Sequence, residues 1–95
     1  MVRIFVAIAV VAIFSAHAEA ADPGYCKHYA EQAIWQYNRS LKIPNCYQGD
    51  NAVWVPNFDH HYQWCLGVPY EQARAGDDMR GRRLHQCSMA AYGHP

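Results

Sequence analysis

The chain has six histidines, and neutral imidazole is the commonest metal ligand in proteins, so metal binding is the first chemistry to consider. His60 and His61 are adjacent in an expected helix, so they point about 100° apart and cannot chelate one ion as residues four apart would. A zinc or copper site would therefore have to join His61 to His28 or His85 across helices. The alternative is that His61 is a buried hydrogen-bonding residue beside Trp64 and that His60 is solvated.

Aromatic side chains offer a second chemistry, because flat rings supply large contact areas at low entropic cost and suit peptides or sugars. After residue 20 the chain holds three tryptophans, seven tyrosines and Phe58. Tyr29, Tyr37, Phe58 and Tyr62 fall on expected core faces. We expect a binding surface for a peptide, protein or glycan, formed by the loop of residues 39–56 and the exposed side of the second helix: Tyr47, Trp54, His60, His61 and Trp64. The alternative is that these rings simply fill a small core.

The charged residues and the serine hydroxyl groups do not favour nucleic-acid binding or catalysis. The chain has 8 Lys and Arg against 8 Asp and Glu. Because phosphate neutralisation dominates nucleic-acid affinity, a near-neutral chain is not expected to bind nucleic acid. Asp77 and Arg80 are three apart and are expected to form a partly buried ion pair. Ser40 and Ser88 lie in no nucleophile-elbow sequence, so the chain is not expected to be an enzyme, and a small hydrolase is only the second alternative.

Residues 1–20 resemble a secretory leader. Arg3 supplies a positive charge, Ile4 to Phe14 is an unbroken apolar run, and Ala16-His17-Ala18 and Ala18-Glu19-Ala20 are small-x-small cleavage sites. The run is about half the length that a membrane span needs. We expect residues 1–20 to be cleaved, with a cut after Ala18 as the alternative. The mature chain, residues 21–95, would then be secreted or periplasmic, without a membrane span.

Four cysteines in a short exported chain predict two disulfides: Cys26, Cys46, Cys65 and Cys87. None of the spacings is C-x-x-C, so neither a thioredoxin-like redox motif nor a zinc ribbon is indicated. Four cysteines allow three pairings, and the sequence alone does not choose among them. We favour Cys26–Cys87 with Cys46–Cys65, which would clamp the first helix to the last and pin the loop to the second helix.

Three helices are expected to position these groups. Asp22 and Pro23 start the first, which has an apolar face at helical spacing and spans about 23–38. Asn57 caps the second, about 58–66, and Gly67 is expected to end it in a left-handed conformation. Pro69 opens the third. Its glycines predict a bend or break near residues 76–77, so that its second half spans about 77–90. The inward row of the third helix is expected to contain Tyr70, Ala73, Asp77, Arg80, Leu84, Cys87 and Ala91.

The whole pattern resembles a group of small exported, cysteine-containing proteins of alphaproteobacteria of uncharacterised function. The resemblance rests on Cys26-x-x-Tyr29-Ala30, Cys46, Trp54, His61-x-x-Trp64-Cys65 and Arg80-x-x-x-Leu84-x-x-Cys87. It implies a bacterial source, the periplasm and a fold; it implies no activity.

The sequence thus predicts an all-α domain of three helices with a long irregular loop, stapled by two disulfides. The expected function is that of an exported binding module with no cofactor. A metal-binding protein that uses His61 with His28 or His85 is the alternative. The sequence leaves the ligand and the oligomeric state open.

Overall fold

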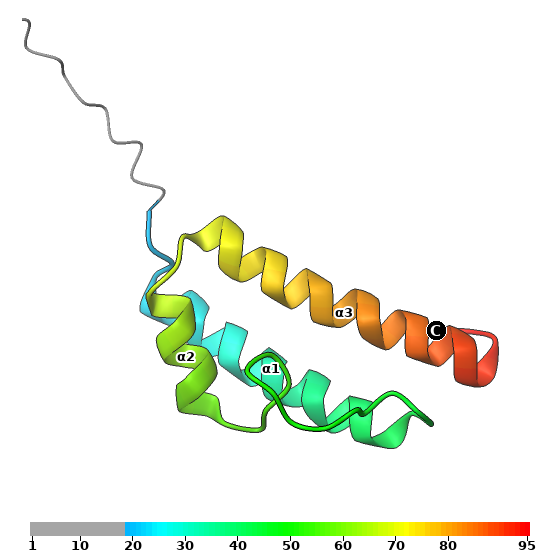
Figure 1. Cartoon of the computed structure of the whole chain (residues 1–95). Helices are drawn as coiled ribbons and strands as arrows, with labels where there is room; N and C mark the ends of the chain where they lie inside the picture. The colour runs from blue at the N-terminus through cyan, green and yellow to red at the C-terminus, as the bar shows by residue number, and fades with distance from the viewer. Residues whose placement is uncertain (1–18) are drawn as a thin grey trace, which may run out of the picture.

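The computed structural model describes residues 19–95 and has three α-helices, as the all-α prediction requires. α1 spans Pro23–Lys42, α2 spans Phe58–Leu66 and α3 spans Tyr70–Tyr92 (Figure 1). The predicted leader, apart from Glu19 and Ala20, lies outside the described residues. Within residues 19–95, no helix combines the length and the apolar character that crossing a membrane requires.

α1 begins where the sequence predicts and ends four residues later. The Asp22 carboxylate accepts a hydrogen bond from the Tyr25 backbone N–H at 2.9 Å and so caps the helix. The helix continues past Asn38 because its end is set by Pro44. Proline disfavours the helical conformation in the residue before it, and Ile43 is extended, with φ −97° and ψ 125°.

α2 has the predicted bounds, but its last turn differs from the expectation. The Asn57 side chain accepts a hydrogen bond from the His60 backbone N–H at 3.0 Å, as an N-cap should. Gly67 is not left-handed: its φ is −92°, and its N–H bonds the carbonyls of Gln63 and Trp64 at 3.2 and 3.1 Å. The helix therefore closes with a tight right-handed turn that leads directly into α3.

α3 is one continuous helix, so the predicted bend near residues 76–77 is wrong. The cost of two glycines is up to about 2 kcal/mol, and burial of one face of the helix offsets it. Most of the predicted inward row is buried, although Tyr70 and Ala91 are exposed. Gly93, with φ 74°, ends the helix in the left-handed conformation and donates its N–H to the Met89 carbonyl at 2.9 Å.

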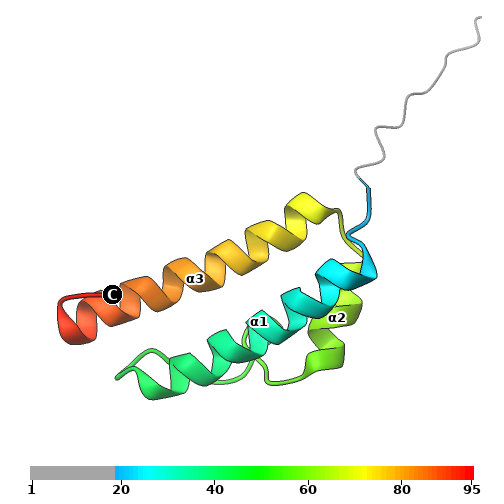
Figure 2. The ribbon, with the colours of Figure 1, turned by 180° about the vertical axis from the view of Figure 1, so that it is seen from behind.

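α1 and α3 run side by side in the same direction (Figures 1 and 2). Near their starts, Ala73 of α3 packs in the same buried cluster as Tyr29 of α1. At their ends, the Tyr92 hydroxyl donates to the Lys42 carbonyl at 3.4 Å. α2 packs against the first half of α1 and its C-terminal end meets the start of α1 (Figure 1).

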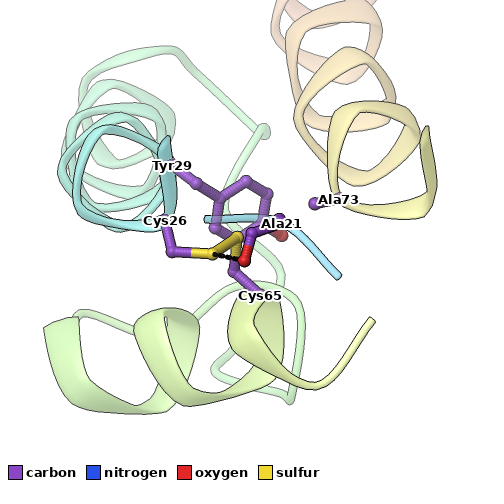
Figure 3. Close-up of a cluster of buried hydrophobic side chains, with 5 residues drawn as sticks. All are labelled: Ala21, Cys26, Tyr29, Cys65 and Ala73. Carbon is purple, nitrogen blue, oxygen red and sulfur yellow. Dashed lines mark hydrogen bonds between the residues drawn. A yellow bond between two sulfur atoms is a disulfide. The ribbon is translucent and has the colours of Figure 1, made fainter. Parts of the chain in front are cut away.

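The core consists of two small clusters, one near each end of α1. The first cluster, shown in Figure 3, contains Ala21, Cys26, Tyr29, Cys65 and Ala73. Here the Cys26 Sγ lies 3.9 Å from the Ala21 carbonyl oxygen. An oxidised sulfur carries no proton, so this is a packing contact. The second cluster contains Ile43, Cys46, Leu84 and Cys87, with Trp54 packed against it. Phe58, predicted to be in the core, is 40% exposed and stacks on Tyr62.

Each cluster contains one disulfide, and the pairing differs from the one we favoured. Cys26 is bonded to Cys65 and Cys46 is bonded to Cys87. The direction of the helices explains why the preferred pairing is wrong. Cys87 lies 17 residues beyond the start of α3, which is about 25 Å along a helix, so it sits at the opposite end of the molecule from Cys26. A disulfide joins Cα atoms less than about 7 Å apart.

Candidate functional site

A cavity of about 190 Å³ lies where α2, α3 and the loop between α1 and α2 meet. Three of the predicted binding residues line it, namely His60, His61 and Trp64. The loop adds Ala52 and Val53 to its wall. The other side is formed by Tyr29 of α1 and by three residues of α3, which are Gly76, Met79 and Arg80. Apart from the histidines and Arg80, the lining is mostly apolar and aromatic.

Two neighbouring histidines of α2 hold the loop against the cavity. His60 Nε2 lies 2.8 Å from the Ala52 carbonyl oxygen, and His61 Nε2 lies 2.7 Å from that of Val55. Because a carbonyl oxygen only accepts, each ring must carry its proton on Nε2. The adjacent rings point to different faces of the helix, with an interplanar angle of 80°, and so reach two points of the same loop.

His61 is the buried member of this pair, with 2% of its surface exposed. Burial lowers its pKa from the ordinary 6.5, and the charges of Arg80 and His60 lower it further, while the hydrogen bond to Val55 acts in the opposite direction. The imidazole is therefore neutral at neutral pH. The expectation that His61 is a buried hydrogen-bonding residue beside Trp64 agrees with this environment.

Arg80 is the most unusual residue that lines the cavity, because it is charged and only 2% exposed. Its Nε donates to the Gln36 side-chain oxygen at 2.7 Å, and its guanidinium carbon lies 4.8 Å from the centre of the Tyr29 ring. The predicted ion pair with Asp77 is absent from the described residues, where the one contact within 4.0 Å between a basic and an acidic side chain joins the His28 imidazole to the Glu31 carboxylate.

Gln36 stands between the two charges instead. Its side-chain nitrogen donates to the Asp77 carboxylate at 2.9 Å and to the Asp77 carbonyl at 3.2 Å, while its oxygen accepts from Arg80. The Gln36 amide thus links the Asp77 carboxylate to the Arg80 guanidinium through hydrogen bonds, but it does not neutralise the positive charge of Arg80. Within residues 19–95, the buried Nη2 of Arg80 has no hydrogen-bond partner.

The other two predicted binding residues lie elsewhere. Tyr47 and Trp54 line a separate cavity of about 130 Å³, beside Cys46 and Arg83. The turn at Asn51 separates the two groups: its side-chain oxygen accepts from the backbone N–H groups of Val53 and Trp54 at 2.8 and 2.9 Å. This turn directs Val53 to the first cavity, while Trp54 packs on the second core cluster.

Tyr47 also belongs to a cluster of polar contacts that fixes the loop. The hydroxyls of Tyr37 and Tyr47 both donate to one carboxylate oxygen of Asp50, each at 2.7 Å. These two bonds lower the pKa of Asp50, the Tyr47 bond first. They raise the pKa of both tyrosines, and that of Tyr37 rises well above its usual 10.0.

The histidines considered as metal ligands do not come together. His28 is exposed and faces Glu31 at 3.8 Å, and His85 is exposed on α3, while His61 is buried. The part of the chain that the structure describes has no group of three His, Cys, Asp or Glu residues arranged to hold a metal ion.

Sequence reasoning missed Tyr29, Met79 and Arg80 as residues of the cavity. Tyr29 and Arg80 were placed on inward faces, which is correct, but an inward face does not reveal an unfilled space beside it. The signal in the sequence was an arginine in an apolar row, because such a residue needs a partner. A comparison with protein-family models, curated proteins and solved structures finds no match to this chain.

Proposed function

We propose that this protein is a small exported binding module that takes a peptide, protein or glycan in the cavity between α2, α3 and the loop. The proposal has two parts, export and binding. The compartment rests on the disulfides and the leader-like sequence, and the activity rests on the cavity.

Two disulfides in the described residues fit an oxidising compartment, which is the periplasm or the outside of the cell. No cysteine of the chain remains free. Thiols in the cytosol are kept reduced, and a domain of this size depends on its staples. Export is therefore consistent with the way in which the fold is stabilised.

The observation that carries the binding role is the convergence of polar and aromatic groups on one apolar cavity. Trp64 is 38% exposed and Met79 43% exposed, so a partner can reach the apolar wall. Behind them lie the buried His61 and Arg80. Binding sites typically combine an apolar lining with a few fixed polar groups, and exposed aromatic and arginine side chains dominate binding energies.

Arrays of immobilised peptides and glycans, probed with the oxidised protein, test this role. We expect Trp64→Ala to abolish the binding that the array detects. Trp35→Ala is the matched control, because Trp35 is 56% exposed but lies away from this cavity. Binding that survives Trp64→Ala and is lost with Trp35→Ala would move the site to the α1 surface. An array with no bound member would reject the binding role for these ligand classes.

A further inference from the structure

We propose that Arg80 is the receptor for a carboxylate, and that the ligand part entering the cavity is a small apolar group that bears this carboxylate. The inference rests on the proposed binding role and specifies the chemistry of its ligand. The free C-terminus of a peptide with an apolar last residue has this chemistry, and so does a small carboxylic acid.

Arg80 carries a buried positive charge that no carboxylate of the described residues pairs with. Arginine stays protonated in proteins, so the guanidinium of Arg80 is a positive charge with 2% of its residue surface exposed. A buried charge is normally paired with an opposite charge. Here the nearest carboxylate in the hydrogen-bond network, Asp77, is bonded to Gln36, and Nη2 of Arg80 has no partner among residues 19–95. A ligand carboxylate would supply both the charge and the missing acceptor.

The guanidinium of Arg80 is already held in place before a ligand enters. Its Nε donates to Gln36, and its central carbon lies over the Tyr29 ring, 4.8 Å from the ring centre. Gln36 is itself fixed by two bonds to Asp77. A receptor group that is ordered before binding does not lose side-chain entropy on binding, and a planar guanidinium suits a carboxylate better than any other cation does.

The size and the lining of the cavity define the rest of the ligand. A cavity of about 150 Å³ lined by apolar residues can hold benzene. The present cavity, about 190 Å³, therefore accommodates one ring or one branched aliphatic group with a carboxylate attached. It is smaller than the roughly 300–1,000 Å³ that drug-sized ligands need. Trp64, Met79 and Val53 provide the apolar wall for such a group.

Two small probes of the same shape separate the carboxylate from the apolar group. Benzoate and its neutral counterpart benzamide are titrated separately into the isotopically labelled, oxidised protein at constant ionic strength. The Trp64 indole N–H and the methyl group of Met79 report binding by NMR. We expect benzoate to bind at least about tenfold more tightly than benzamide, which is the usual effect of a charge-assisted hydrogen bond. This comparison uses the wild-type chain alone.

Variants then assign the preference to one residue. Arg80→Met replaces the guanidinium with an apolar side chain, and we expect it to remove the preference for benzoate. Arg82→Met makes the same change two residues away on the exposed side of α3, and it should leave the preference intact. A preference that persists in Arg80→Met, or that disappears in Arg82→Met, would overturn the assignment to Arg80.

The outcomes distinguish this inference from the binding role itself. If both probes shift Trp64 and Met79 with equal affinity, the cavity binds ligands but the carboxylate inference fails. If neither probe shifts these residues while an array peptide does, the carboxylate inference also fails and the binding role stands. A peptide with a free C-terminal leucine and its amidated form distinguish the sources, because a peptide source predicts that only the free form competes with benzoate.

Discussion

Gly76 of α3 faces the ring of Trp64 so closely that a Cβ atom at position 76 would lie 3.3 Å from Trp64 Cη2. The same atom would lie 3.0 Å from the Tyr29 hydroxyl oxygen. The sequence suggested that this glycine would weaken the helix. In the structure it is the position at which α3 approaches the aromatic wall of the cavity, and no other residue fits without a shift of a few tenths of an ångström.

Replacing Gly76 should therefore give less stability than replacing another helical glycine. At Gly81 an added Cβ meets nothing closer than 4.0 Å, and we expect Gly81→Ala to stabilise the protein by up to about 1 kcal/mol. Gly76→Ala should gain at least about 0.5 kcal/mol less, because Tyr29 and Trp64 must move. Urea unfolding measures both, and Trp64 chemical shifts should change in Gly76→Ala only. Equal gains would show that the contact is not tight.

Lowering the pH should destabilise the protein through His61. Its folded pKa is below the ordinary 6.5, so the unfolded chain takes up the proton more readily. The contribution of His61 is complete above about pH 6.5 and is lost as the pH falls through that value toward the folded pKa. His61→Gln, which keeps a donor for Val55, should flatten the slope of unfolding free energy between pH 7 and 5. His85→Gln, at an exposed position on α3, is the control and should leave the slope unchanged.

The Asp50 carboxylate should control the titration of Tyr37. The hydrogen bond from Tyr37 to Asp50 is the largest cause of the raised tyrosine pKa. The stability that this bond contributes is present below pH 10 and is lost as the pH rises through the folded pKa. In Asp50→Asn we expect the tyrosinate absorbance of Tyr37 to develop at a lower pH than in the wild type. Tyr37→Phe identifies the signal, and an unchanged titration curve in Asp50→Asn would contradict the assignment.

The first described residues should add stability to the domain. The Glu19 carbonyl accepts from the Tyr70 N–H at 3.2 Å, and the Ala21 N–H donates to the Val68 carbonyl at 3.2 Å. Ala20 forms an antiparallel bridge with Pro69. A chain that starts at Ala21 loses the Glu19 bond and places an ammonium group on a residue that is 5% exposed. We expect it to be about 1–2 kcal/mol less stable than one that starts at Glu19, by thermal unfolding.

That comparison bears on the two cleavage sites predicted for the leader-like segment. The cut after Ala20 fits the small-x-small pattern best, but the cut after Ala18 keeps the bridge. The sequence predicts the cut after Ala20, and the intact mass of the protein recovered from the periplasm or the medium decides between the two starts. Equal unfolding temperatures for the two chains would show that the contacts of Glu19 and Ala20 add no stability.

Each disulfide closes a loop of similar length, so their removal should cost similar amounts. The sequence separations are 39 and 41 residues, for which the chain-entropy argument gives about 4 kcal/mol each. We expect the Cys26→Ala/Cys65→Ala and Cys46→Ala/Cys87→Ala variants to be comparably destabilised. A large difference would mean that native packing, and not loop closure, dominates one bridge.

Mapping the bridges by mass spectrometry needs the right protease. Trypsin has no site between Cys46 and Cys65, so it leaves both cysteines in one peptide. A protease that cleaves before aspartate cuts at Asp50 and Asp59 and separates them, but it leaves Cys26 and Cys46 together, so the digest needs both enzymes, with trypsin cutting after Lys27. The peptide with Cys26 should then be joined to the one with Cys65, and a Cys26–Cys87 product would contradict the structure.

The helices were predictable because their signals are local. Asp22 and Asn57 are caps that act within three residues, and the apolar rows follow the helical period. The end of α1 was predicted four residues too early, although Pro44, which sets it, is also a local signal. The pairing of the cysteines was not, because it depends on the parallel course of α1 and α3, and helical period says nothing about relative direction.

The candidate site was predictable only in part, for the same reason. His60, His61 and Trp64 share one helix, so their proximity followed from the sequence. Tyr47 and Trp54 were grouped with them because all were aromatic or near the loop, but the hydrogen bonds of Asn51 turn the chain between the two cavities. Arg80 does not pair with Asp77 because Gln36, which is 44 residues from Arg80 along the chain, bonds to both side chains.

The two bridges also determine how the molecule responds to proteolysis. The segment between Cys46 and α2 is largely exposed, and it is the natural point for a protease to cut. Such a cut yields one fragment with Cys26 and Cys46 and another with Cys65 and Cys87, and both disulfides join them. Because each of the two disulfides joins the fragments, the nicked protein remains a two-chain molecule. It runs as one band in a denaturing gel until it is reduced.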